Sequence, residues 1–90
     1  MEIFRIRLNK LIQENKISKY KLAKDIGVNK QTVNFWCDGI NEPKISYLQK
    51  IALYFDVSAD YLIGLENEDG SINTKIINSF NNVNNSNIKL

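Results

Sequence analysis

The chain has 90 residues, 43% of them hydrophobic, and a formal net charge of +2, which fits one small domain with or without a tail. It contains no histidine and one cysteine, so it lacks the commonest general base and the ligands of a thiolate zinc cluster. We therefore expect no enzyme, no metal and no cofactor. We also expect a cytoplasmic protein without membrane contact, because the sequence shows neither a signal peptide nor an apolar run of about 18 residues.

Helical spacing of apolar residues predicts three helices before Gly39. The first ends near residue 15. Ser18 and Asn29 are expected to cap the second and third, and Gly27 and Gly39 to end them. The expected inner faces are Phe4, Leu8, Leu11 and Ile12 in the first helix, Leu22, Ala23 and Ile26 in the second, and Val33, Trp36 and Cys37 in the third.

Two further helices are expected after the loop of residues 39–43. The fourth would bury Leu48, Ile51, Ala52 and Phe55. A short fifth helix would begin after Ser58 and end near Gly64. No stretch of useful length alternates in the manner of a β-strand. The sequence therefore predicts an all-α fold, a compact five-helix domain over residues 1–65.

Residues 66–90 are expected to form a polar tail. Eight of the thirteen asparagines lie from Asn67 onward, a composition that favours disorder. Four apolar residues nevertheless fall on one face of a helix, at positions Ile72, Ile76, Phe80 and Val83. The tail is thus either disordered or forms a short helix that packs on the domain, on a second subunit or on a partner protein.

Charge is distributed unevenly along the chain. Residues 1–55 hold ten Lys/Arg and five Asp/Glu, whereas residues 56–70 hold five Asp/Glu and no basic residue. A basic front half followed by an acidic patch fits a polyanionic ligand, although an ordinary solvated surface has the same composition.

The second helix, the glycine turn and the third helix form a helix-turn-helix at this spacing. The stretches ISKYKLAKDIGVNKQTVNFW (residues 17–36) and GINEPKISYLQKIALYFDVSADYLIG (residues 39–64) resemble the Cro/phage-repressor-type, or Xre-type, helix-turn-helix family. The similarity runs without a gap over about residues 6–62. It implies a lambda-repressor-like fold and a bacterial or phage transcriptional regulator. Such a protein, most often a repressor, would bind double-stranded DNA sequence-specifically as a homodimer on a near-palindromic operator.

The chain departs from the family at one buried pair. Family members carry an Arg late in the first helix and a Glu after the aromatic residue of the third, and these form a partly buried ion pair. Here the two positions are Ile12 and Cys37. Replacing both charges by apolar residues can be neutral, whereas losing one leaves a buried charge without a partner. We therefore expect Cys37 to pack against Ile12 rather than to act as a redox sensor.

Base readout is expected from the exposed N-terminal part of the third helix, because an α-helix fits the major groove. Gln31 and Asn34 can each hydrogen-bond adenine, and Lys30 can donate to guanine. Phe35 can lie against a thymine methyl group or pack under the Ile40 loop. This set favours an A/T-rich half-site. The residues assigned to base contact are Lys30, Gln31, Asn34 and Phe35.

Contacts to the phosphate backbone are expected from residues that flank the third helix. Lys19 replaces a family Gln that contacts phosphate, and Lys44 replaces a residue that caps the fourth helix. Asn29 has a second interpretation, as a helix cap alone. The residues assigned to phosphate contact are Lys19, Asn29, Thr32, Asn41 and Lys44, with Ser18 and Tyr20 as weaker candidates.

Two candidate surfaces for a homodimer follow from the sequence. One is the end of the fourth helix with the fifth (Tyr54, Phe55, Tyr61, Leu62 and Ile63), and the other is the apolar stripe of residues 72–83. Release from DNA would come from an antirepressor or other partner protein, from proteolysis or from concentration. The alternatives are an antitoxin-like regulator whose tail binds a partner protein, and a helical protein-interaction domain that has lost DNA binding.

Overall fold

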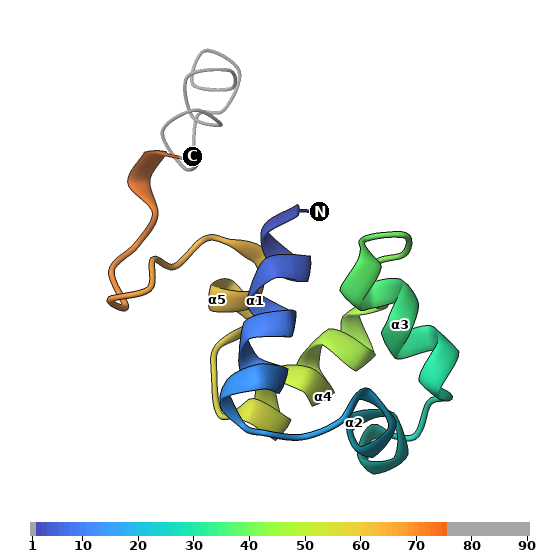
Figure 1. The fold of residues 1–90 in the computed structure, drawn as a ribbon. Coiled ribbons are helices and arrows are strands. Elements are labelled where there is room, and N and C mark those ends of the chain that lie inside the picture. The colour runs from blue at the N-terminus through green and yellow to red at the C-terminus, as the bar shows by residue number, and fades with distance from the viewer. Residues whose placement is uncertain (1, 76–90) are drawn as a thin grey trace.

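The computed structural model describes residues 2–75, and in this range the chain forms five α-helices with one isolated antiparallel bridge. The helices are α1 (Glu2–Glu14), α2 (Lys19–Ile26), α3 (Lys30–Asp38), α4 (Ile45–Phe55) and α5 (Ala59–Ile63). Figure 1 shows α1 between α3 on one side and α5 on the other. The predicted all-α fold is confirmed. None of the helices within residues 2–75 has the length and apolar character needed to cross a membrane.

The predicted helix ends are confirmed by their caps. The side chains of Ser18, Asn29 and Ser58 each accept a hydrogen bond from the backbone N–H three residues further on, at 2.8–3.0 Å. Gly27 ends α2 with φ +86°, a left-handed conformation that favours glycine. Lys44 stands at the start of α4 and makes no cap hydrogen bond with its side chain, so this helix begins without the stabilisation of about 1 kcal/mol that a capping side chain gives.

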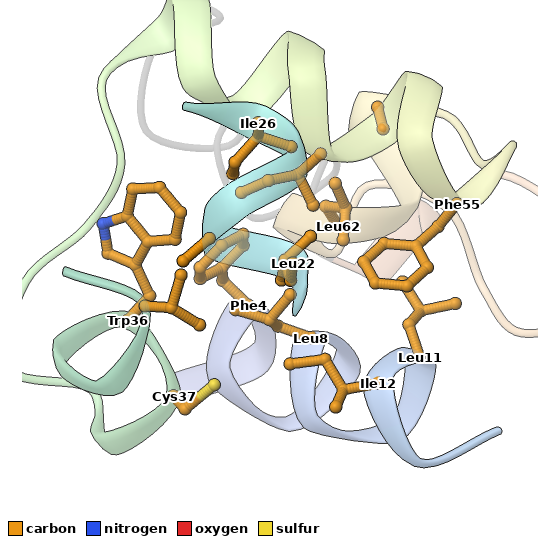
Figure 2. Close-up of a cluster of buried hydrophobic side chains, with 14 of the residues drawn as sticks. Phe4, Leu8, Leu11, Ile12, Leu22, Ile26, Trp36, Cys37, Phe55 and Leu62 are labelled. Atoms are coloured by element: carbon orange, nitrogen blue, oxygen red, sulfur yellow. The ribbon is translucent and has the colours of Figure 1, made fainter. Parts of the chain in front are cut away.

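All five helices contribute to one hydrophobic core (Figure 2). Each helix supplies one side chain with no exposed area, and these are Leu8, Leu22, Val33, Ile51 and Leu62. Burial of each such side chain contributes about 1.5–3 kcal/mol. Trp36 and Cys37 of α3 lie at one side of the cluster and Phe55 of α4 at the other (Figure 2). The inner faces expected from helical spacing are thereby confirmed except at Leu48, which is half-buried at the edge of the core.

Cys37 and Ile12 are both buried in this core, as expected for a position pair that has lost its two charges together. The Cys37 side chain is 3% exposed. Burial raises the pKa of the Cys37 thiol, which keeps the sulfur protonated and unreactive. The observed environment is that of a packing residue.

Three of the five residues expected on one dimer surface are not available to a second subunit. Phe55, Tyr61 and Leu62 are buried inside their own domain, whereas Tyr54 and Ile63 are half-buried. The reason is that α5 has only five residues and packs most of its apolar side chains against α1 and α4. The large exposed apolar side chains of α4 are instead Ile45 and Leu53, which are 85% and 75% exposed.

The chain after α5 folds back onto α1 through a buried arginine that no sequence pattern singled out. The Arg7 side chain is 6% exposed. Its guanidinium donates hydrogen bonds to the backbone oxygen of Tyr61 and, at 2.6 Å, to that of Glu66. It also lies 4.3 Å from the centre of the Tyr61 ring, a cation–π arrangement. Arg7 therefore connects α1 to α5 and to the segment that follows.

Glu68 completes this attachment. Its carboxylate accepts hydrogen bonds from Lys10 at 2.8 Å and from the Tyr61 hydroxyl at 3.1 Å. Its other near neighbour is the Nε of Arg7, at 3.6 Å. The Lys10 ammonium, with a smaller contribution from the Tyr61 hydroxyl, holds the pKa of the Glu68 carboxyl below its ordinary value. This part of the acidic patch is thus neutralised within the domain.

Residues 66–73 form a turn and a bridge, not a helix. Glu66 pairs with Ile72 in the antiparallel bridge, and the Asn73 side chain donates to the backbone oxygen of Gly64 at 2.8 Å. Ile72 is exposed. The other members of the predicted apolar stripe, Ile76, Phe80 and Val83, lie outside the described residues.

Candidate nucleic-acid interface

The core fixes which face of α3 is turned outward. Val33, Trp36 and Cys37 are buried, whereas Lys30 and Gln31 in the first turn are exposed. Asn34 and Phe35 also lie outside the buried face, and both are half-buried rather than exposed. The four residues assigned to base contact therefore occur together on the outer side of one helix. Lys30 and Gln31 extend furthest into solvent.

The start of α3 is held in place by local hydrogen bonds. The Oδ1 atom of Asn29 accepts from the backbone N–H of Thr32 at 2.8 Å and from its hydroxyl at 2.9 Å. Asn29 is thus a helix cap, and its carbonyl oxygen is occupied by this role. Contact with phosphate would use its amide nitrogen, which is the donor group of the side chain.

Three phosphate candidates surround one groove between α3 and the start of α4. Thr32, Asn41 and Lys44 all border this groove, and its other lining residues are Trp36, Glu42, Pro43 and Tyr47. Each of these three residues was expected to contact phosphate, but no sequence pattern predicts that they share a groove. The remaining candidates, Ser18, Lys19 and Tyr20, lie separately at the start of α2.

Tyr47 is a groove residue that sequence reasoning missed. Its ring centre is 6.1 Å from that of Trp36, with 46° between the ring planes, and Lys50 Nζ lies 5.2 Å from the centre of the Tyr47 ring. Tyr47 and Lys50 are three positions apart on α4, a spacing that places them on one helix face. This spacing predicts the proximity of Lys50 to the Tyr47 ring, but not the place of Tyr47 in the groove.

The basic residues divide into paired and unpaired groups. Lys21 forms an ion pair with Asp25 at 2.8 Å, and Tyr54 also donates to the same carboxylate at 2.6 Å. These two bonds, that from Lys21 foremost, lower the pKa of Asp25. Within residues 2–75, Lys19, Lys30 and Lys44 make no ion pair. The same is true of Lys16, Lys24, Lys50 and Lys75 in this range. The unpaired charges available to an anionic ligand thus include those of Lys19, Lys30 and Lys44.

The helix-turn-helix family matches residues 8–62, which is more than half of the chain and includes α2, the turn and α3 in full. This chain belongs to the Cro/C1-type helix-turn-helix family. The family predicted from residues 17–64 is thus confirmed, together with the five-helix fold of this helix-turn-helix protein.

Two solved structures are similar to this helix-turn-helix protein. The solution structure of the SOS-response transcriptional repressor LexA from Eubacterium rectale is 39% identical, with a TM-score of 0.67 over 69% of this chain and 66% of that chain. The crystal structure of a transcriptional regulator from Listeria innocua is 26% identical, with a TM-score of 0.66 over 96% of this chain and 78% of that chain. The present chain thus spans slightly less than two thirds of the LexA chain. No curated protein sequence matches it.

Proposed function

We propose that this helix-turn-helix protein is a sequence-specific transcriptional repressor that binds a near-palindromic double-stranded DNA operator as a homodimer. The observation that carries the proposal is the outer side of α3, where Lys30 and Gln31 are exposed above a side that is fully packed into the core. Lys19 at the start of α2 and Lys44 just before α4 carry charges that no ion pair neutralises within residues 2–75. The transcriptional roles named for the two similar structures agree with it.

The proposed readout places the first turns of α3 in the major groove. Gln31 is a donor and acceptor for adenine, and Lys30 is a donor for guanine O6 and N7. Asn34 and Phe35 are half-buried, so only the exposed part of each side chain would be available for base contact. A thymine methyl group is the base feature that suits the exposed part of the Phe35 ring.

The proposed backbone contact places a phosphate at the groove lined by Thr32, Asn41 and Lys44. A hydroxyl, a carboxamide and an ammonium group supply hydrogen-bond donors there. Contacts of this kind fix the register of the protein on DNA and determine the salt dependence of binding, without reading the sequence.

Selection of bound fragments from random-sequence duplexes, followed by titration of the selected duplex across salt concentration, tests the function directly. The expected result is a two-fold symmetric motif with two half-sites about one helical turn apart. Recovery of no motif from the full chain would contradict the proposal.

Substitutions at Gln31 and Lys19 are expected to have different effects on binding. Gln31→Ala should cost about 1–3 kcal/mol and relax specificity at one base position, because it removes a base contact. Lys19→Ala should weaken binding to all duplexes and reduce the slope of log affinity against log salt by about one, because it removes a phosphate contact. Titrations of the selected duplex and of its single-base variants measure both. Identical behaviour of the two variants would show that these roles are wrongly assigned.

The proposed dimer surface is an uncharged groove on α4 and the start of α5. It is lined by Ile45, Leu48, Gln49, Ala52, Leu53, Val57 and Ala59. A two-fold interface brings the same patch of both subunits together, so an uncharged patch avoids contacts between like charges. Because Ile45 and Leu53 are largely exposed, a second copy of the chain would remove much apolar area from water. This face uses exposed side chains of α4 in place of the buried Phe55, Tyr61 and Leu62.

Leu53→Asp is expected to convert the dimer into a monomer, because it would place a carboxylate of each subunit in an apolar interface. Sedimentation equilibrium of the free protein and of its complex with the selected duplex measures the change. Ile72→Asp is the matched control, since Ile72 is also exposed but lies in the segment after α5. A Leu53→Asp variant that still dimerises on DNA would exclude this face. An antitoxin-like role of the tail depends on residues 76–90, which lie outside the described residues.

A further inference from the structure

Asn9 connects α1 to the C-terminal end of α3. Its side-chain amide nitrogen donates one hydrogen bond to the backbone oxygen of Arg5 and one to the backbone oxygen of Cys37, both at 2.9 Å. The first bond lies within α1, but the second crosses to the last turn of α3. Carbonyl groups in the last turn of a helix have no N–H partner within the helix. Asn9 therefore supplies the donor that Cys37 needs.

Within residues 2–75, this is the only side-chain hydrogen bond between α1 and the unit of α2 and α3. The buried apolar side chains of α1 and α3, among them Ile12 and Cys37, belong to the common core. Apolar contacts are not directional, whereas a hydrogen bond restricts both distance and angle. The Asn9 bond is thus the contact that can fix the orientation of α3 on α1.

Both ends of α3 are consequently fixed by different elements. Asn29 caps the start, and Gly39 and Ile40 donate backbone hydrogen bonds to Phe35 and Trp36 at the end. Only Asn9 attaches the end of the helix to a separate helix by a side-chain hydrogen bond within the described residues. Its loss would leave the body of α3 folded, loosen its C-terminal end at Gly39 and Ile40, and allow its axis to shift.

We propose that Asn9 is a positioning residue for base readout, acting through α3 without touching DNA itself. This inference rests on the proposed function. Base contacts by Gln31 require placement within about 0.5 Å, and such placement depends on supporting residues that lock the reading element. Phosphate contacts by lysine tolerate more displacement, because the ammonium is a point charge on a flexible stem. Asn9 should therefore affect specificity more than general affinity for DNA.

Asn9→Ala and Asn15→Ala form a matched pair that tests this role. Asn15 donates to the backbone oxygen of Leu11 at 2.8 Å, four residues earlier, as Asn9 does to Arg5, but it makes no bond to α3. The probes are the duplex selected from random sequences by the wild-type chain and a scrambled duplex of equal length. Asn9→Ala should lower affinity for the selected duplex roughly threefold to tenfold, the effect of one net hydrogen bond. In Asn9→Ala, affinity for the scrambled duplex and the salt slope should not change. Asn15→Ala should leave affinity for both duplexes and the salt slope unchanged.

Two further measurements separate positioning from simple destabilisation. Asn9→Gln keeps the amide donor and should recover part of the specificity, whereas Asn9→Asp replaces the donor by an acceptor and should recover none. Amide hydrogen exchange of free protein should accelerate at Gly39 and Ile40 in Asn9→Ala but not in Asn15→Ala.

These measurements test the role of Asn9 and the proposed function separately. Equal ratios of specific to non-specific affinity in the Asn9→Ala and Asn15→Ala variants would overturn the inference and leave the proposed function intact. Failure of the wild-type chain to select any duplex would instead refute the proposed function. Unchanged exchange at Gly39 and Ile40 in Asn9→Ala would overturn the inference without reference to DNA.

Discussion

Cys37→Glu is expected to lower the free energy of unfolding by about 3–5 kcal/mol, because it would bury a carboxylate without a partner. Cys37 lies in the core with Ile12 from the facing helix. A loss of this size corresponds to a fall in melting temperature of roughly 4–8 °C for each kcal/mol in a domain of this length. Urea unfolding followed by circular dichroism measures the change.

The double variant Ile12→Arg with Cys37→Glu is the informative companion. It restores the ion pair that the resemblance to the family implies at these positions, so it should recover part of the stability lost by Cys37→Glu alone. Asp38→Glu serves as the control, because Asp38 is the exposed neighbour of Cys37. If Cys37→Glu melted at the same temperature as the wild type, the assignment of position 37 to the core would be wrong.

Arg7→Met is expected to lower the free energy of unfolding by about 2–5 kcal/mol. The substitution leaves the backbone oxygen of Glu66 without its donor, at about 1–3 kcal/mol. It also removes the bond from a charged group to the backbone oxygen of Tyr61, at about 1.5–3 kcal/mol, although that oxygen keeps the N–H of Gly64 as a donor. It should also release residues 66–73, because Glu68 loses a neighbouring positive charge. Urea unfolding measures the first effect, and amide exchange at residues 66–73 measures the second.

Arg5→Met is the matched control for this variant. Arg5 lies on the same helix, but its guanidinium pairs with Glu2 on the surface at 2.8 Å. Exposed pairs of this kind contribute little to stability, so the expected change is within about 1 kcal/mol. Equal losses in the Arg5→Met and Arg7→Met variants would mean that the buried hydrogen bonds of Arg7 do not hold the segment after α5.

The helices and their ends could be predicted because the responsible interactions are local. Ser18, Asn29 and Ser58 bond to backbone groups three residues away, a distance that sequence spacing shows directly. The role of Arg7 could not be predicted, because its acceptors lie 54 and 59 residues further along the chain. Counted by charge alone, Arg7 belongs to the basic half of the chain, although its charge is buried inside the domain.

The candidate interface was predictable to a similar extent. The outer positions of α3 follow from helical spacing, so Lys30 and Gln31 could be assigned before the fold was known. The groove that unites Thr32, Asn41 and Lys44 depends on how α4 packs against α3, which no local pattern encodes. The place of Tyr47 in this groove and the bond from Asn9 to Cys37 likewise depend on how separate helices pack. Contact of any of these residues with DNA stays a prediction.

Because residues 66–73 are attached to α1, a label placed after α5 can be kept apart from the side of the domain that carries α3. In Figure 1 the chain leaves α5 and runs along the side of α1 that is turned away from α3. A fluorophore or an affinity handle attached to the chain after α5 is therefore expected not to obstruct the approach of α3 to a duplex. Since the chain's single cysteine is buried, a cysteine placed at position 75 would be the accessible thiol for such labelling.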